Sequence, residues 1–223
     1  MTVRPARHAG TPITMGYDTA EAAHPSKAKQ SPARLARIER AHANRQADLH
    51  VVIEDVGKER NVSSVMRTCE AVGVGRVHVI CTDGARQSVS PRISKGAEQW
   101  LEVDYYDEPG TCLALLASAG VALYCTGLDA RAKSFRDIDY TRPCAIVLGN
   151  EIGGASSTHL ELADEVIMIP MMGLVQSLNV GAAAAVVLYE AQRQRAAVGM
   201  YADFGLSPVK GGLAYDPRGA VRD

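Results

Sequence analysis

Short runs of apolar residues recur along the chain and are separated by stretches long enough to form helices. The runs lie at 49–53, 77–80, 121–124, 145–148 and 166–169, and their length is typical of buried strands. Helix-length segments fall between them at 62–72, 110–119 and 158–162. Strands that alternate with helices predict a mainly parallel sheet with helices on both faces, within one α/β domain over residues 47–203.

Two further helices are expected at the flanks of the sheet. Leu35 and Ile38 recur at helical spacing, so we expect a short amphipathic helix within residues 31–46. The rest of its surface is basic and carries Arg34, Arg37, Arg40 and Arg45. The last helix is expected to begin near Ser177 and to end at about Val198, with alanines that allow another element to approach closely.

Proline and glycine mark both ends of the chain. Residues 1–30 contain Pro5, Pro12 and Pro25 without a hydrophobic period, which is typical of a flexible arm. Residues 204–223 hold four glycines and two prolines, which predicts a disordered tail.

Charge is unevenly distributed, although the 223 residues have a formal net charge of only −1. Before Ala47 there are 8 Lys and Arg against 3 Asp and Glu, and after Glu190 there are 5 against 3. The segment between is therefore acidic, with 11 against 19. An acidic core with basic ends favours a polyanion held by the extensions. Since 47% of the residues are apolar, collagen-like and wholly disordered classes are excluded.

The five cysteines form no CxxC pair and have no histidine at metal-ligand spacing, so neither a disulfide framework nor a metal site is expected. The most apolar region, 167–189, is interrupted by proline and polar residues, so we expect no membrane span. The chain begins without a signal-peptide pattern. Free thiols favour the cytoplasm.

Three polar or glycine-rich stretches are unusual for a plain α/β domain. In Asn61-Val-Ser-Ser-Val-Met-Arg67, Asn61 is placed to cap a helix, and Arg67 lies more than one turn further along. Gly149-Asn-Glu151-Ile-Gly-Gly follows a buried strand, at the edge where α/β proteins bind ligands. It is neither a GxGxxG nor a Walker loop, which argues against a dinucleotide or P-loop site.

The third stretch contains Ser177-Leu-Asn179, where polar residues interrupt an apolar region at an expected helix start. Their side chains and the free backbone N–H groups are available to a ligand. Taken alone, the three stretches also fit helix capping, a tight turn and packing. Met171 and Met172 are interpreted as packing residues.

In this order and spacing, the three stretches resemble the SpoU branch of the SPOUT methyltransferases, which are tRNA and rRNA ribose 2'-O-methyltransferases. The resemblance covers about residues 49–201. The segment 169–195 and the phrase Arg136-Asp-Ile-Asp-Tyr-Thr-Arg-Pro143 are most similar to the tRNA guanosine-18 type. Gly181 departs from that type, in which close relatives usually have serine. The resemblance implies a homodimer with a C-terminal deep trefoil knot.

The resemblance also implies S-adenosylmethionine as cofactor and a set of site residues. The cofactor is expected to contact Thr126, Gly149, Ile169 and Leu178. The catalytic and substrate-contacting positions fall on Asn61, Arg67, Glu151, Ser177 and Asn179, with Arg67 acting near the cofactor of the partner subunit. Because a guanidinium stays protonated in proteins, we expect Arg67 to bind a phosphate and to stabilise the developing alkoxide, and the route of the proton stays open.

The basic flanks are expected to hold RNA phosphates. The arginines concerned are Arg34, Arg37, Arg40, Arg45, Arg193 and Arg195. About 45 residues precede the core, which is short for the N-terminal modules of some rRNA enzymes, so we expect guanosine 18 in the D-loop of tRNA as the target, and no DNA partner. The alternatives are an rRNA methyltransferase and a silent knotted RNA-binding module. A small-molecule enzyme would not explain the basic flanks.

Overall fold

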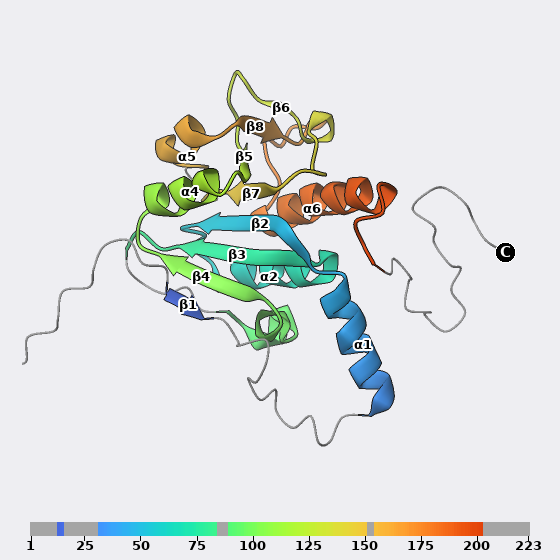
Figure 1. Ribbon diagram of the computed structural model, residues 1–223. Coiled ribbons are helices and arrows are strands. Elements are labelled where there is room, and N and C mark those ends of the chain that lie inside the picture. Colours follow the sequence, from blue (N-terminus) through green and yellow to red (C-terminus); the bar gives the residue numbers. More distant parts are fainter. Residues whose placement is uncertain (1–12, 16–30, 84–88, 151–153, 203–223) are drawn as a thin grey trace, which may run out of the picture.

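The structure is a computed structural model that describes residues 13–15, 31–83, 89–150 and 154–202. One eight-stranded sheet runs through it in the order β1-β4-β3-β2-β7-β5-β8-β6 (Figure 1). Its strands are β1 (Ile13–Met15), β2 (Gln46–Glu54), β3 (Val74–Ile80), β4 (Glu102–Tyr106), β5 (Ala122–Thr126), β6 (Lys133–Ser134), β7 (Cys144–Leu148) and β8 (Glu165–Met168). All strand pairs are parallel except β1 with β4.

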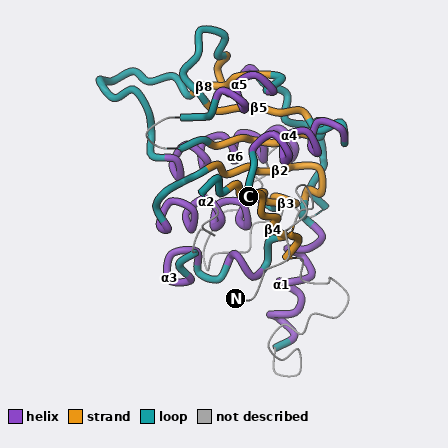
Figure 2. The backbone as a smooth tube through the Cα atoms, turned by 90° about the vertical axis from the view of Figure 1, so that its left-hand side faces the viewer, coloured by secondary structure: helices purple, strands orange, loops and turns teal. Residues whose placement is uncertain are grey.

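Helices cover both faces of this sheet (Figure 2). They are α1 (Pro32–Ala43), α2 (Glu59–Val72), α3 (Pro91–Ser94), α4 (Pro109–Ser118), α5 (Ser157–Leu162) and α6 (Val180–Ala197), with short 3-10 turns η2 (Ala97–Gln99) and η3 (Phe135–Asp137). The predicted α/β class, mainly parallel sheet and two-sided helix cover are confirmed. Within the described residues, no helix combines the length and hydropathy needed to cross a bilayer.

The period-2 alternation of the strands divides the core into two. On one face, buried side chains of α2 and α6 such as Val65 and Leu188 pack on Val51 and Ile53 of β2. On the other face, α4 packs on the side that carries Val52. Burial of apolar side chains on both faces is the main force that holds such a sheet together.

The α2 and α6 helices approach closely because Gly181 has no side chain. A Cβ at Gly181 would lie 2.7 Å from Ser64 Oγ and 2.9 Å from Ser64 Cβ. Any larger residue there would push the start of α6 away from α2. The glycine that departs from the usual serine therefore sets the spacing of two helices that border the site described below.

Three sequence predictions about elements need correction. The last helix begins at Val180 rather than near Ser177, because Asn179 caps it. The pattern predicts no strand at Glu102–Tyr106, whose mixed sequence Glu-Val-Asp-Tyr-Tyr hides an edge-proximal strand. Nor does it predict an element before Ser31, whereas Ile13–Met15 pair with β4. The other residues of the predicted arm and the predicted tail from 204 lie outside the described residues.

Candidate functional site

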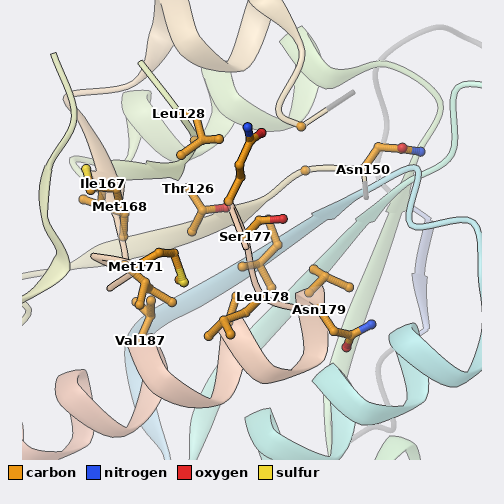
Figure 3. Close-up of a pocket in the computed structure, with 18 of the residues that line it drawn as sticks. Thr126, Leu128, Asn150, Ile167, Met168, Met171, Ser177, Leu178, Asn179 and Val187 are labelled. Carbon is orange, nitrogen blue, oxygen red and sulfur yellow. The ribbon is translucent and has the colours of Figure 1, made fainter. Parts of the chain in front are cut away.

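A cavity of about 580 Å³ opens at the carboxyl ends of β5, β7 and β8, between the starts of α2 and α6 (Figure 3). Parallel strands bring their carboxyl ends to one edge, and helix starts at that edge expose unpaired backbone N–H groups. Residues distant in sequence therefore meet here. The described lining residues include Lys58, Asn61, Thr126, Leu128, Gly149, Asn150, Ile169, Met171, Gln176, Ser177, Leu178, Asn179 and Val187.

Two asparagines connect the helices that border the cavity. The Asn179 Nδ2 donates a hydrogen bond of 3.1 Å to Asn61 Oδ1, and the Asn179 Oδ1 accepts one of 3.0 Å from the Gly181 N–H. Asn61 is not the cap of α2 as the sequence suggests, since the helix starts at Glu59 with Lys58 in the cap position. Asn61 is instead a buried residue of the first turn, 5% exposed, held in one orientation at the cavity wall.

The glycine at the end of β7 is required by the backbone around it. A Cβ at Gly149 would lie 2.3 Å from the Ala155 nitrogen and 2.4 Å from the Gly154 carbonyl carbon. Opposite it, the Thr126 hydroxyl donates to the Val147 carbonyl at 3.0 Å and so fixes the ends of β5 and β7 together. The resulting wall offers backbone rather than side chains to a ligand.

Behind this wall, a buried carboxylate and imidazole hold the turn that follows Gly149. His159 Nδ1 donates to Glu54 Oε2, and the Ser156 N–H donates to the same oxygen at 3.2 Å. The Asn150 amide adds a bond of 2.7 Å to the Asp55 carbonyl. Burial raises the pKa of Glu54, but the hydrogen bonds from His159 and Ser156 outweigh it and hold that pKa below its ordinary value. These contacts tie the turn to the end of β2.

Comparison with known proteins identifies the family of this chain. A family model described as the SpoU rRNA Methylase family matches residues 48–189. The chain belongs to the SpoU methylase family. It is 45% identical over 171 residues, covering 77% of this chain and 74% of the relative, to a tRNA (guanosine(18)-2'-O)-methyltransferase of Escherichia coli. The enzyme of the same name from Thermus thermophilus is 42% identical over 173 residues, with 78% and 89% covered.

Solved SpoU structures agree with this assignment. The crystal structure of a TrmH/SpoU tRNA modifying enzyme from Aquifex aeolicus has a TM-score of 0.74 at 39% identity, covering 78% of this chain and 89% of that one. The SpoU methyltransferase AviRb from Streptomyces viridochromogenes, in complex with the cofactor AdoMet, has a TM-score of 0.59 at 28% identity, covering 68% and 62%.

The cavity of this SpoU chain gathers seven of the nine sequence-predicted catalytic and cofactor residues. They are Asn61, Thr126, Gly149, Ile169, Ser177, Leu178 and Asn179. Arg67 is not among the lining residues; it is exposed on α2, and its Nη1 donates to the Ile93 carbonyl at 3.5 Å. Glu151 lies outside the described residues.

Two of the predicted RNA-binding arginines of this SpoU chain make contacts within the fold, and one of them, Arg195, is fully buried and so is not accessible to RNA. Arg195 is 0% exposed and donates to the carbonyls of Tyr140 and Arg142 and to Asp48 Oδ1. Arg45 is partly buried, and its guanidinium donates to the carbonyls of Val74 and Trp100. A helical pattern records which residues are charged but not which of them the fold turns inward.

The remaining four arginines face outward. Arg34, Arg37 and Arg40 are exposed on α1, and Arg193 is exposed while paired with Glu190. Figure 1 shows α1 extending from the amino end of β2, whereas the cavity lies at the carboxyl ends of β5, β7 and β8.

Sequence reasoning missed several lining residues of the SpoU cavity. Asn150 lies within a predicted motif and Lys58, Leu128 and Gln176 lie close to predicted site residues, and that proximity was the only signal for them. The interpretation of Met172 as a packing residue does not hold within this chain, and Met171 is only partly buried. Met171 lines the cavity, and Met172 is 94% exposed.

Proposed function

We propose that this chain methylates the ribose 2'-hydroxyl of guanosine 18 in the D-loop of tRNA, with S-adenosylmethionine as the methyl donor. The observation that carries the proposal is the single cavity at the carboxyl edge, which collects residues from all three motifs. The curated relatives from Escherichia coli and Thermus thermophilus, which carry the guanosine-18 name, support the same substrate. A tRNA substrate in turn favours a cytoplasmic location.

The cavity fits S-adenosylmethionine in size and chemistry. The backbone wall at Gly149 and the apolar side chains of Ile169 and Leu178 suit a nucleoside base, which is flat and needs a few backbone hydrogen bonds. The relative from Streptomyces viridochromogenes binds AdoMet on a similar fold. When bound, the cofactor supplies a methyl group on a positively charged sulfur.

The residues of this chain then position the acceptor and exclude water. The Asn61–Asn179 hydrogen bond fixes two amide groups at the cavity wall, where they orient the ribose, while Ser177 shapes the segment beside the methyl donor. Glu151 is proposed to hold a donor in place. Arg67 binds the adjacent phosphate and stabilises negative charge that develops on the ribose oxygen.

We also propose that two chains form a homodimer and that Arg67 serves the cavity of the partner subunit. Arg67 does not line the cavity of its own chain. In addition, large apolar side chains are exposed in the segment that precedes α6 and on α6 itself. These are Met172, Leu174, Val175 and Tyr189. Because monomers rarely expose several large apolar side chains together, these residues favour an interface. The return of the chain from β8, near one edge of the sheet, to α6, which packs against α2 and β7, is compatible with the knot that the family resemblance implies.

Complementation between two inactive variants tests the shared site. If Arg67 acts across the interface, mixed dimers of Arg67→Ala and Asn179→Ala contain one cavity in which both residues are intact. Co-refolding equal amounts is expected to restore about a quarter of the wild-type methyl transfer. No recovery, with mixed dimers verified by mass, would place Arg67 in its own cavity.

The position of α1 supports a large folded RNA as substrate. Its exposed arginines lie at the amino end of β2, whereas the cavity lies at the carboxyl edge. A strand of nine residues spans about 30 Å. An RNA that contacts both regions of one chain must bridge that length, which a folded tRNA does and a short oligonucleotide does not.

The proposal is tested by the transfer of labelled methyl groups from S-adenosylmethionine to tRNA and to rRNA in separate reactions. Nucleoside analysis is expected to find 2'-O-methylguanosine in tRNA, and a transcript with guanosine 18 replaced by adenosine is expected to stay unlabelled. Label only in rRNA would overturn the target. Label in neither RNA, with folded protein, would favour a silent RNA-binding module.

A further inference from the structure

The cavity contains one charged side chain among its described lining residues, and sequence reasoning did not select it. Lys58 stands immediately before α2, three residues from Asn61, and is exposed. In the described part of the chain, no hydrogen bond or ion pair engages its ammonium group. The other described lining side chains are apolar, amide or hydroxyl groups. Within the described residues, the ammonium group of Lys58 is therefore available to a ligand in the cavity.

Lys58 also occupies the N-cap position of α2, where a lysine side chain does not stabilise the helix. The helix cap is usually Ser, Thr, Asp or Asn, whose side chains accept a hydrogen bond from the first turn. Ser31, Ser156 and Asn179 do so for α1, α5 and α6, whereas Lys58 makes no such bond for α2, as is also the case for the cap residues of α3 and α4. A local preference that is broken at a site is typical of a residue retained for function.

The charge of the methyl donor identifies the ligand chemistry. A cationic sulfur in the cavity would be repelled by a lysine unless an anion lies beside that lysine. Two anions of the ligands could lie there, a backbone phosphate of RNA and the carboxylate of the cofactor. Lys58 lies three residues before Asn61, whose amide is bonded to Asn179 and is proposed above to orient the ribose. This placement favours the phosphate.

We propose that Lys58 binds a phosphate of the substrate RNA next to the target ribose and so positions that ribose in the cavity. The inference rests on the proposed function. Lys58→Gln is expected to raise the KM for tRNA about fivefold and to leave kcat within about twofold, because the lost contact is an exposed ion pair. The slope of log KM against log salt is expected to fall by about one.

Three further variants separate this role from a structural one. Lys58→Arg is expected to restore the tRNA KM, since either cation binds phosphate. Lys58→Ser is expected to raise the melting temperature by capping α2 while it weakens tRNA binding, a combination that a structural lysine would not produce. Lys133→Gln, which removes an exposed lysine paired with Glu165 outside the cavity, is the matched control and is expected to change neither.

The outcomes distinguish an RNA phosphate from the cofactor carboxylate as the partner of Lys58. They also distinguish a failure of this inference from a failure of the proposed function. An unchanged tRNA KM and salt slope in Lys58→Gln would overturn the inference. So would weaker S-adenosylmethionine binding by calorimetry with an unchanged tRNA KM, because that result assigns Lys58 to the cofactor carboxylate. If the wild type methylates no RNA, the proposed function fails; a gel-shift assay in which Lys58→Gln binds tRNA more weakly, with a smaller salt slope, would still support the phosphate contact.

Discussion

The two edges of the sheet are both rich in polar side chains, yet they use them in opposite ways. At the amino edge, Arg195 and Arg45 donate to backbone carbonyls, and the Gln46 amide donates to the Met200 carbonyl at 3.1 Å. At the carboxyl edge, Ser177 and Asn179 are exposed and line a cavity. Polar groups satisfied inside the protein stabilise the fold, whereas polar groups held in place but accessible can act on a ligand.

The largest expected effect on stability comes from a substitution at the amino edge of the sheet. Arg195→Met leaves the carbonyls of Tyr140 and Arg142 without their donor and Asp48 without its partner. It is expected to cost about 3 kcal/mol and to lower Tm by about 6–12 °C. Arg193→Met, on the exposed side of the same helix, is the control and is expected to change stability by less than about 0.5 kcal/mol. Equal Tm values for the two variants would contradict the claim that the buried polar contacts at the amino edge stabilise the fold.

The matching change at the carboxyl edge is Asn179→Ser. The hydroxyl can still cap α6, but it is too short to reach Asn61, to which the Asn179 amide now donates. Methyl transfer is expected to fall about 100-fold, with stability changed by less than about 1 kcal/mol. Single-turnover assays and thermal unfolding of the same preparation measure both. A loss of stability that accounts for the loss of transfer would contradict the account.

Gly181→Ala tests whether the spacing of α2 and α6 sets the position of Asn179. The added Cβ would overlap Ser64, so we expect a loss of about 1–2 kcal/mol together with slower transfer. Gly110→Ala is the matched control, because Gly110 is also the second residue of a helix and has nothing within 4 Å of its added Cβ.

A double-mutant cycle tests whether the cost of Gly181→Ala comes from overlap of the added Cβ with Ser64. In a Ser64→Gly background, Gly181→Ala is expected to cost markedly less than in the wild type, since the atoms it meets are gone. Equal costs in both backgrounds would show that the two helices are not held apart by this contact.

Replacing Arg34, Arg37 and Arg40 together by glutamine sharpens the comparison at α1. All three are exposed, so stability is expected to stay the same while the KM for tRNA rises about tenfold and its salt dependence weakens. Substituting Arg45, which is tied to Val74 and Trp100, is expected to lower stability instead. A salt dependence unchanged by the triple substitution would remove α1 from the RNA contact.

The smallest expected effect on stability comes from the buried pair Glu54 and His159 behind the cavity wall. Since the pKa of Glu54 is lower in the folded state than its ordinary value of 4.5, its carboxylate stabilises the fold above that value and the contribution is lost as pH falls through the folded-state pKa. Glu54→Gln is expected to cost about 1 kcal/mol at pH 7. Urea unfolding from pH 7 to 3 should find that this difference disappears at the acid end; a difference independent of pH would contradict it.

Sequence patterns predicted the parallel α/β order because each buried strand is a short apolar run between helices. They missed β4, where charged Glu102 and Asp104 alternate with apolar residues and pair with Arg76 of the neighbouring strand. Such compensation between distant residues leaves no local trace. The same limit hid the contact between Glu54 and His159, which are 105 residues apart.

Site residues that belong to a sequence motif could be predicted, whereas contacts between residues that are distant in sequence could not. Family resemblance placed Asn61 and Asn179 in the site, but not the hydrogen bond between them. Charge counting selected Arg195 for RNA, although its burial follows from the docking of α6 on the sheet. Lys58 escaped notice because a lysine before a helix has no distinctive pattern until the cavity beside it is known.

The most direct test of the account compares Asn179→Ser and Arg195→Met in parallel, with methyl transfer to tRNA and thermal unfolding measured on each. The account predicts that the first variant unfolds close to the wild-type temperature and transfers about 100-fold more slowly. It predicts that the second unfolds at a clearly lower temperature and, where still folded, transfers methyl groups at nearly the wild-type rate. Near wild-type transfer by Asn179→Ser would contradict the claim that the carboxyl-edge cavity is the site of methyl transfer.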